Sequence, residues 1–338
     1  MTLPRRKRRS LKAAVIGYGG AFNMGRAHAG WLAAAGIPTA AVCDVDVARL
    51  RQAEEDLPGV KTYEAVEDVL KDDDVGLCVV ILPHNLHAEV AIQCAEAGRH
   101  VIVEKPMCLT VAEADAMIAA ARESGVMLSV FHNRRHDGDF KAIHDVIRRG
   151  IIGDVFLIEA SIGGYGHPGH WWRSDKKISG GALYDWGAHF LDWILHFVHS
   201  TVRGVTAYTQ KRLWTDVTNE DHAQVIVSFE NDCVAELQAS TMNRAPVPRW
   251  RILGTKGAIV DDWKEPFTVH TEHEGYPAVL NVPYQKTNWQ AYYDNIASHL
   301  RDGAELDVKP EEARRVIAIL EAADRSARSG ATVVPAYH

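Results

Sequence analysis

Short apolar runs alternate with amphipathic segments over the first 131 residues of the chain. The apolar runs lack polar alternation, which is typical of strands covered on both faces of a sheet. The predicted strands are 12–17, 39–44, 76–82, 100–103 and 126–131. The predicted helices are 25–35, 45–56, 64–71, 86–97 and 110–124. Strands that alternate with helices form parallel βαβ units, so the pattern predicts a doubly wound parallel sheet.

The pattern changes after residue 131, where several predicted strands alternate polar and apolar positions, as half-buried strands do. These strands are 155–162, 202–210, 223–229, 234–240 and 250–253, and the predicted helices are 137–149, 182–197, 289–301 and 311–329. The connections between the strands are too short for crossover helices, which favours an open, largely antiparallel sheet. We therefore expect a basic tail at 1–10, a doubly wound domain at 11–131, and a second α/β domain at 132–338 with the open sheet and closing helices.

Composition and charge narrow the function classes. The chain has 338 residues, 47% of them hydrophobic and 24% charged, which is ordinary for a soluble protein large enough for two domains. A formal net charge of −7 gives no indication of nucleic-acid binding. The five cysteines show no C-x-x-C pair, which favours reduced thiols in a cytoplasmic protein. No apolar run approaches the ~20 residues of a membrane helix.

The basic segment 5–12 resembles a twin-arginine export signal. However, the apolar stretch that follows, Ala13 to Ile16, is short and is interrupted from Gly17 onward. The same stretch also forms the first predicted strand, so its removal would destroy the fold. We therefore expect a solvated basic tail and a cytoplasmic protein.

A glycine-rich loop joins the first predicted strand to the first helix, with the spacing Gly17-x-Gly19-x5-Gly25. Glycines at such a turn allow backbone N–H groups to approach a pyrophosphate. Asp44 ends the second strand, where a carboxylate accepts hydrogen bonds from ribose hydroxyls and repels a 2′-phosphate, which favours NAD over NADP. The alternatives are a plain tight turn and a helix N-cap at Asp44. The residues expected at the nucleotide are Gly17, Gly19, Gly20, Ala21, Phe22, Asn23, Met24 and Asp44.

Charged residues follow the strand at 100–103 immediately, as Glu104-Lys105-Pro106. Ligands of doubly wound sheets bind beyond the carboxyl ends of the strands, so this lysine is expected beside a bound nicotinamide. There it can hydrogen-bond a substrate hydroxyl and lower the pKa of that hydroxyl, while Glu104 pairs with it or holds it in position. The alternative is a surface Lys-Pro turn.

A second informative stretch is Gly180-Gly181-x3-Asp185-x-Gly187-x-His189. Asp185 and His189 are spaced i, i+4 and share one face of the predicted helix, which Asp192 could also share. A carboxylate beside an imidazole fixes its tautomer and forms a proton-transfer pair. The alternative is a capping aspartate and a histidine of the core.

Other candidate side chains lie directly after the last strand of the first domain and in one loop of the second domain. Arg134 or Arg135 could bind an acidic or polyol substrate, or form a salt bridge with Asp137 or Asp139. The loop at 165–173 is rich in aromatic residues and glycine, which suits sugar stacking by Tyr165 and Trp172, or alternatively an ordered interface. His132/His136 and His167/His170 have ligand-like spacings, but no cysteine or carboxylate partner completes a set, so we expect no metal.

Taken in order, the glycine loop, the strand-end Glu-Lys-Pro and the G-G-x3-D-x-G-x-H stretch resemble the glucose–fructose oxidoreductase, inositol dehydrogenase and rhizopine-catabolism family (Gfo/Idh/MocA). The resemblance covers nearly the whole chain. It departs from the family at the lengthened glycine loop. The resemblance implies an N-terminal Rossmann domain for NAD, a C-terminal α/β domain with an open sheet, and a sugar or cyclitol substrate. It also implies a homodimer or homotetramer formed through the open sheet.

The resemblance further implies roles for individual residues. The implied catalytic residues are Lys105, Asp185 and His189. These three also contact the substrate, together with Arg134, Tyr165 and Trp172. Pro83, Asn85 and His87 are the implied cofactor-lining loop, to which Glu104 and Lys105 are added.

The leading hypothesis is an NAD-dependent dehydrogenase that acts on a secondary hydroxyl of a sugar, cyclitol or related polyol. In this mechanism His189, oriented by Asp185, removes the hydroxyl proton and Lys105 stabilises the alkoxide. The alternative is a redox-neutral, NAD-dependent glycosidase or lyase that cleaves a glycoside through a transient keto-sugar. A third interpretation, a non-catalytic NAD sensor, is disfavoured by the presence of both Lys105 and the Asp185/His189 pair.

Overall fold

The computed structural model describes residues 11–19, 22–245 and 247–337, which form two compact units. Unit 1 contains the described residues up to Cys108, together with Ala112–Phe131 and Gln290–Glu311. Unit 2 contains Leu109–Val111, His132–Trp289 and the described residues from Glu312 onward. The expected basic tail at 1–10 lies outside the described residues.

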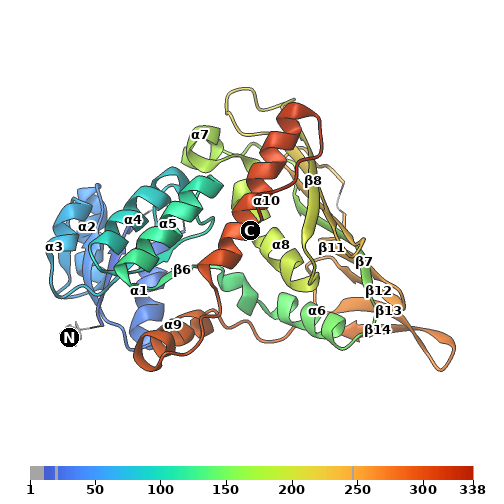
Figure 1. The fold of residues 1–338 in the computed structure, drawn as a ribbon, viewed down its shortest axis with the longest axis horizontal. Helices are drawn as coiled ribbons and strands as arrows, with labels where there is room; N and C mark the ends of the chain where they lie inside the picture. Colours follow the sequence, from blue (N-terminus) through green and yellow to red (C-terminus); the bar gives the residue numbers. More distant parts are fainter. Residues whose placement is uncertain (1–10, 20–21, 246, 338) are drawn as a thin grey trace. The chain divides into compact units, whose positions relative to one another are not determined.

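Unit 1 is built on a parallel sheet of six strands in the order β3-β2-β1-β4-β5-β6. Figure 1 draws its helices α1 to α5 in blue to green. The strands are β1 (Ala13–Ile16), β2 (Thr39–Cys43), β3 (Lys61–Tyr63), β4 (Leu77–Val80), β5 (His100–Val103) and β6 (Leu128–Val130). The helices are α1 (Met24–Ala34), α2 (Val47–Asp56), α3 (Val66–Lys71), α4 (His87–Glu96), α5 (Val111–Ser124) and α9 (Gln290–Asp302). Every residue of β1 and β4 is buried, as expected for central strands covered on both faces. The strand order reverses at β1, which creates the switch point where ligands of such sheets bind.

Helix α9 belongs to unit 1, although the sequence analysis placed all residues from 132 onward in one domain. It contacts α1 and carries two buried tyrosines. The hydroxyl of Tyr292 bonds Ser129 Oγ at 2.9 Å, and Tyr293 contacts His28 of α1. The amphipathic pattern of this segment predicted a helix, but it did not indicate that the helix belongs to unit 1.

Unit 2 is built on a sheet of eight strands in the order β14-β13-β12-β11-β7-β10-β9-β8. Its strands are β7 (Val155–Gly163), β8 (Val202–Gln210), β9 (His222–Phe229), β10 (Val234–Ser240), β11 (Trp250–Gly254), β12 (Gly257–Asp261), β13 (Phe267–His273) and β14 (Tyr276–Val282). Its helices are α6 (Gly138–Arg148), α7 (Lys176–Ser179), α8 (Ala182–Phe197) and α10 (Pro310–Ser329, from Glu312 in this unit). All neighbouring strands are antiparallel except β7 and β10, which run parallel.

One face of the unit 2 sheet is buried, and α8 packs against β10, β7 and β9. In β9 and β10 every second residue is buried, so the other face carries half-exposed side chains such as Gln224 and Glu236. The open sheet expected from the sequence is therefore present. Among the described residues, no helix is both long and apolar enough to cross a lipid bilayer.

The sequence analysis did not predict strands β3, β12, β13 or β14. β3 has three residues, none of them buried, and β14 is mostly exposed, so neither shows the apolar run or strict alternation that marks a strand. β3 and β14 are edge strands of their sheets, where pairing with one neighbour, and not burial, accompanies the extended backbone.

Candidate active site

The glycine loop of unit 1 is held against the carboxyl end of the sheet by close backbone contacts. Gly17 has φ 93°, and a Cβ at this position would lie 2.0 Å from the carbonyl oxygen of Ile81. Its N–H also donates to the carbonyl of Cys43 at 2.8 Å. Only glycine adopts this conformation in this space, so the first position of the motif is a steric requirement.

In the lengthened loop, Gly25 has the role of the third glycine of the motif, which is close packing of the helix on the loop. A Cβ on Gly25 would lie 2.7 Å from Tyr18 Cα, so its absence lets α1 pack closely on the loop. Asn23 takes the left-handed conformation, with φ 49°, immediately before α1 begins. Phe22 and Asn23 are exposed and Met24 is half-buried, whereas Gly20 and Ala21 lie outside the described residues. The first-turn N–H groups of α1 follow this loop, which is the arrangement that binds a pyrophosphate.

Asp44 links the loop to the end of β2. Its Oδ2 accepts a hydrogen bond from the Tyr18 N–H at 2.8 Å, and its Oδ1 accepts one from the Asp46 N–H at 2.9 Å. The alternative role as N-cap of α2 belongs to Asp46, whose side chain accepts from Ala48 N–H. Each Asp44 oxygen keeps one lone pair for a ribose hydroxyl, so the cradle, the helix start and the carboxylate together fit a dinucleotide.

Lys105 follows β5 at the same end of the unit 1 sheet and is half-buried. Glu104 Oε2 accepts the Lys105 backbone N–H at 3.0 Å, and Oε1 lies 3.0 Å from Nε2 of the buried His28. Burial by itself raises the pKa of Glu104, but the bond to His28 and the nearby charges outweigh it, so the pKa is lowered. Glu104 is therefore ionised and fixes the backbone at Lys105.

The loop after β4 contributes Pro83, Asn85 and His87, which the sequence analysis placed along the cofactor. Pro83 is half-buried and Asn85 is exposed. His87 is fully buried, and its ring nitrogens lie 2.8 Å from the carbonyl oxygens of Pro106 and Leu82. Because no surface of His87 is accessible, it supports the lining segments from behind and does not contact a bound ligand itself.

In unit 2, α8 begins after two glycines with positive φ, Gly180 at 88° and Gly181 at 115°. This turn leaves Asp185 in the first turn of the helix, partly exposed. His189 lies one turn further on and is 4% exposed, with the Trp186 ring 5.7 Å and the His132 ring 6.4 Å from its own ring centre. The i, i+4 spacing of Asp185 and His189 is thus realised on one continuous helix.

Asp192 does not join the pair, contrary to the expectation that it could share their face. Its carboxylate binds Arg135 through two bonds, to Nε at 2.9 Å and Nη2 at 2.6 Å, and Arg135 also bonds Glu312 at 2.7 Å. Burial opposes ionisation, but the charge of Arg135 dominates and holds the pKa of Asp192 below its usual range. Of the two alternatives, Arg135 therefore takes the salt bridge, with partners that the sequence analysis did not name.

Arg134 has a mixed environment. It bonds Asp137 at 2.9 Å, which is the salt bridge weighed from the sequence, and its guanidinium lies 4.5 Å from the centre of the Trp186 ring. Because Trp186 also contacts His189, Arg134 remains in the neighbourhood of the histidine. A partly exposed guanidinium on this aromatic ring can still meet a hydroxyl or an acidic group.

Arg173 joins two of the predicted residues and was missed by sequence reasoning. Its guanidinium lies 4.6 Å from the centre of the Trp172 ring, and its Nη1 is 3.8 Å from Asp185. The signal was a cation directly after an aromatic pair, which is a common arrangement for stacking. Trp172 and Asp185 are therefore brought together within unit 2.

Tyr165 lies apart from these contacts. It is 44% exposed and stacks against Arg244, while Trp214 is 5.8 Å away. The unit 2 contacts described above do not link it to His189, so its assignment to a substrate site is still a prediction.

His167 and His170 have a carboxylate partner, contrary to the sequence analysis. Asp216 lies 3.1 Å from His167 Nε2 and 3.3 Å from His170 Nε2, with all three residues at the surface. However, His167 Nδ1 accepts a hydrogen bond from the Gly169 N–H at 3.0 Å, so the ring proton is on Nε2 and points at Asp216. A metal ligand needs the opposite polarity, with the second ring nitrogen donating. The cluster ties two loops together by hydrogen bonds.

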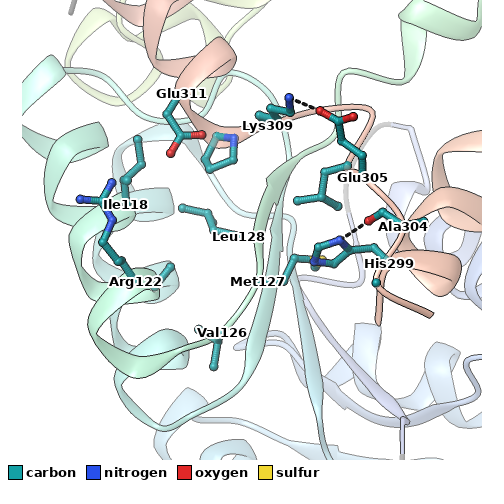
Figure 2. Close-up of a pocket in the computed structure, with 14 residues that line it drawn as sticks. Ile118, Arg122, Val126, Met127, Leu128, His299, Ala304, Glu305, Lys309 and Glu311 are labelled. Carbon is teal, nitrogen blue, oxygen red and sulfur yellow. Dashed lines mark hydrogen bonds and ion pairs between the residues drawn. The ribbon is translucent and has the colours of Figure 1, made fainter. Parts of the chain in front are cut away.

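A cleft of about 440 Å³ opens on unit 1 between α5, the start of β6 and the segment at 303–311 (Figure 2). Figure 2 shows Leu128 and Ile118 on one side and Lys309 beside Glu305 on the other. The cleft is at the amino end of β6, whereas Gly17 and Lys105 are at the carboxyl ends of their strands. None of the candidate site residues lines it.

Two family models match the chain. Residues 11–132 match the model described as an oxidoreductase family with an NAD-binding Rossmann fold, and residues 140–260 match the GFO/IDH/MocA C-terminal domain. The first match ends at residue 132, and the second begins at residue 140.

Relatives and solved structures extend this likeness over the full length. The chain is 28% identical to the NADP(+)-dependent scyllo-inositol 2-dehydrogenase of Bacillus subtilis (strain 168), covering 98% of this chain and 97% of that protein. It is 27% identical to the D-apiose dehydrogenase of Paraburkholderia graminis, with 95% and 89% covered. A solved NAD-binding protein from Listeria innocua is 30% identical, covers 97% of each chain and superposes with a TM-score of 0.86.

Proposed function

Because the chain belongs to the Gfo/Idh/MocA oxidoreductase family, we propose that it oxidises a secondary hydroxyl of a sugar, cyclitol or related polyol with NAD as hydride acceptor. The observation that carries the proposal is the position of Lys105 at the carboxyl end of β5, in the same unit as the glycine cradle. A charged group at that end of a doubly wound sheet lies where cofactor and substrate bind.

The chain's own residues supply the proton chemistry. Lys105 hydrogen-bonds the reacting hydroxyl and stabilises negative charge on its oxygen. His189 removes the hydroxyl proton, and Asp185 orients its ring and contacts the substrate. The bound nicotinamide supplies the position that receives the hydride.

Substrate contacts are assigned to residues that neighbour this pair in unit 2. Trp172 offers an aromatic face, and Arg173 places a cation between it and Asp185. Arg134 lies on Trp186, which contacts His189. Aromatic faces with a few polar groups are typical of sugar sites, which supports the polyol class. Tyr165 completes the proposed set.

The proposed cofactor is NAD, because the Asp44 carboxylate at the end of β2 repels a 2′-phosphate. Arg49 lies against Gly19, where a Cβ would meet its Nε at 2.5 Å, and it is 3.8 Å from Asp46. Its charge offsets part of that repulsion, so we expect NAD to be preferred and NADP still to be used. The ratio of kcat/KM for the two cofactors measures this preference.

We also propose a cytoplasmic homodimer or homotetramer formed through the open face of the unit 2 sheet. That face carries half-exposed residues along several strands, among them Gln224 and Glu236, which are hydrogen-bonded at 2.8 Å. Light scattering coupled to gel filtration gives the subunit number directly.

The test is a screen for NAD reduction over aldoses, inositols and sugar glycosides, after the as-purified cofactor has been identified by mass spectrometry. With an accepted substrate, Lys105→Ala and His189→Ala should each lower kcat by about 10²–10⁴-fold. His196→Gln serves as the matched control, because His196 is on the same helix and its Nδ1 bonds the Asp192 carbonyl.

Near-normal turnover in both alanine variants would overturn the residue assignment. Cleavage of a glycoside without release of NADH would instead favour the redox-neutral glycosidase or lyase. In that reaction the same residues act on a transient keto-sugar whose neighbouring C–H is acidic.

A further inference from the structure

The residues on both sides of Lys105 each contact a buried histidine. Glu104 meets His28 of α1, and the carbonyl of Pro106 meets His87 of α4. Both rings are 0% exposed, and all five residues belong to unit 1. The two helices are separated along the chain, so the contacts do not follow from local sequence.

The contacts of His28 form a chain of hydrogen bonds that ends at the Lys105 backbone. Glu104 is ionised and can only accept, so His28 Nε2 carries the proton and donates to Oε1 at 3.0 Å. His28 Nδ1 contacts the Tyr293 hydroxyl, which keeps its proton because burial raises the pKa of Tyr293. Glu104 Oε2 accepts the Lys105 N–H at 3.0 Å. The order runs from Tyr293 through His28 and Glu104 to the Lys105 backbone.

His87 holds the other side of the turn. Its Nδ1 is 2.8 Å from the Pro106 carbonyl and its Nε2 is 2.8 Å from the Leu82 carbonyl at the end of the β4 segment. Burial lowers the pKa of His87 more than these bonds raise it, so the neutral ring has one proton to share between two acceptors. The ring links the segment after β4 to the segment after β5, and these two strands pair in the sheet.

We propose that His28 and His87 are positioning residues that hold the backbone on each side of Lys105 and thereby set the location of its amine. The proposal deepens the function proposed above and rests on it for the effect on turnover. A misplacement of about 1 Å in a reacting group can cost on the order of 10²-fold in rate. Two bonds at 2.8–3.0 Å to the flanking residues limit such movement.

The two histidines use different ring nitrogens, which allows a crossed experiment. The amide of glutamine places a donor near Nε2, whereas that of asparagine places one near Nδ1. At position 28 the contact toward Lys105 is made by Nε2, and at position 87 by Nδ1. Glutamine should therefore preserve function better at position 28, and asparagine better at position 87.

The expected result for kcat is a reversal between the two positions. His28→Leu and His87→Leu should lower kcat by about 10²-fold, while His28→Gln and His87→Asn should return to within about tenfold of the parent. His28→Asn and His87→Gln should stay near the leucine variants. NADH affinity from fluorescence titration should remain within about threefold throughout, since none of these side chains forms the glycine cradle.

Tyr293→Phe tests the same chain with a single-atom change. It removes the hydroxyl that contacts His28 Nδ1, so the ring loses one of its two fixed contacts and kcat should fall about tenfold. Tyr292→Phe is the matched control, because the neighbouring tyrosine is equally buried but bonds Ser129 Oγ at 2.9 Å. It should leave kcat unchanged while losing a comparable hydrogen bond.

A second measurement does not depend on any substrate. The rate at which trace acetic anhydride modifies Lys105 is read by peptide mass spectrometry, with the exposed Lys256 as internal reference. The relative rate should change severalfold in His28→Leu and His87→Leu and stay constant in Tyr292→Phe.

Unchanged Lys105 labelling in both leucine variants, or equal kcat for asparagine and glutamine at each position, would overturn the positioning role. If Lys105→Ala retains full turnover while labelling shifts as expected, the proposed catalytic role falls and the positioning stands. If Lys105→Ala is inactive while labelling is constant, the catalytic role stands and the positioning falls.

Discussion

Lys105 and His189 are held by different means. Before Lys105, the Glu104 carboxylate accepts the Lys105 N–H and contacts the buried His28. After Lys105, the Pro106 carbonyl contacts the buried His87. His189 lies in the middle of α8, and its ring is surrounded by the rings of Trp186 and His132. A strand end places one group, and packed side chains place the other.

This difference predicts which property a substitution changes at each place, the rate or the stability. Around Lys105, loss of one hydrogen bond displaces the backbone beside its proposed catalytic amine and should change the rate more than the stability. Around His189, one supporting residue, His132, also lies 3.9 Å from Asp192 in the buried charge network that Asp192 forms with Arg135. Changes there should reduce the stability of unit 2 before they change chemistry.

The largest expected effect is in that network. Arg135→Met leaves the Asp192 carboxylate buried without its two bonds, which should cost about 3–5 kcal/mol in the free energy of unfolding. Urea denaturation followed by circular dichroism measures the change.

The double variant Arg135→Met/Asp192→Leu separates charge from packing. It removes both buried charges, so most of the lost stability should return. A double variant no more stable than Arg135→Met would contradict the account of Asp192 as the unpaired charge.

A smaller effect is expected in unit 1, where Gly17 after β1 and Gly59 before β3 form a matched pair. Gly17 and Gly59 have similar positive φ, 93° and 84°, but a Cβ would lie 2.0 Å from Ile81 O at Gly17 and meet nothing within 4 Å at Gly59. Gly59→Ala should cost about 1 kcal/mol for the left-handed conformation, and Gly17→Ala about 2–4 kcal/mol because overpacking adds to it.

NADH binding by the two glycine variants gives a second comparison. Gly17→Ala should abolish detectable NADH binding by fluorescence titration, because the loop must move away from Ile81. Gly59→Ala should bind NADH as the parent does. Equal losses in the two variants would show that conformation, and not space, accounts for the glycine at position 17.

The sequence predicted unit 1 well because its signals are local. Central strands read as apolar runs, and the Gly17 turn and the Lys105 position each follow directly from a strand end. The contacts of His28 were not predicted, because its partners are far away in the sequence. Glu104 is 76 residues and Tyr293 is 265 residues from His28. A histidine on the buried face of α1 was the available signal.

Unit 2 was predicted less completely because its contacts are between distant side chains. The helix at 182–197 and the strands β8 and β10 were predicted with their observed bounds. The partner of Asp192 and the carboxylate beside His167 were not, because no periodicity reports which loop meets which. Arg173 was adjacent to predicted residues but carried no spacing motif.

The smallest effect expected at a charged residue concerns Asp221, which shapes the loop that carries Trp214 and Asp216. It is 1% exposed and accepts the N–H groups of Arg212 and Leu213, each at 2.6 Å. Burial raises the pKa of Asp221, but the bond from Lys211 and these backbone bonds outweigh it and lower the pKa to about 2. Asp221→Asn should cost about 1–3 kcal/mol at pH 7.

The pH dependence has a definite sign. The folded-state pKa of Asp221 is about 2, below the unfolded value of about 3.9, so its stabilisation is complete above the unfolded pKa and is lost as pH falls through the folded one. The stability difference between parent and Asp221→Asn should thus be constant from about pH 5 to 8 and shrink between about pH 4 and 2. Asp232→Asn, at an exposed turn, should match the parent throughout. A difference that instead grows toward acid pH would place the stabilisation of this loop in the aromatic contacts of Trp214 and not in the carboxylate.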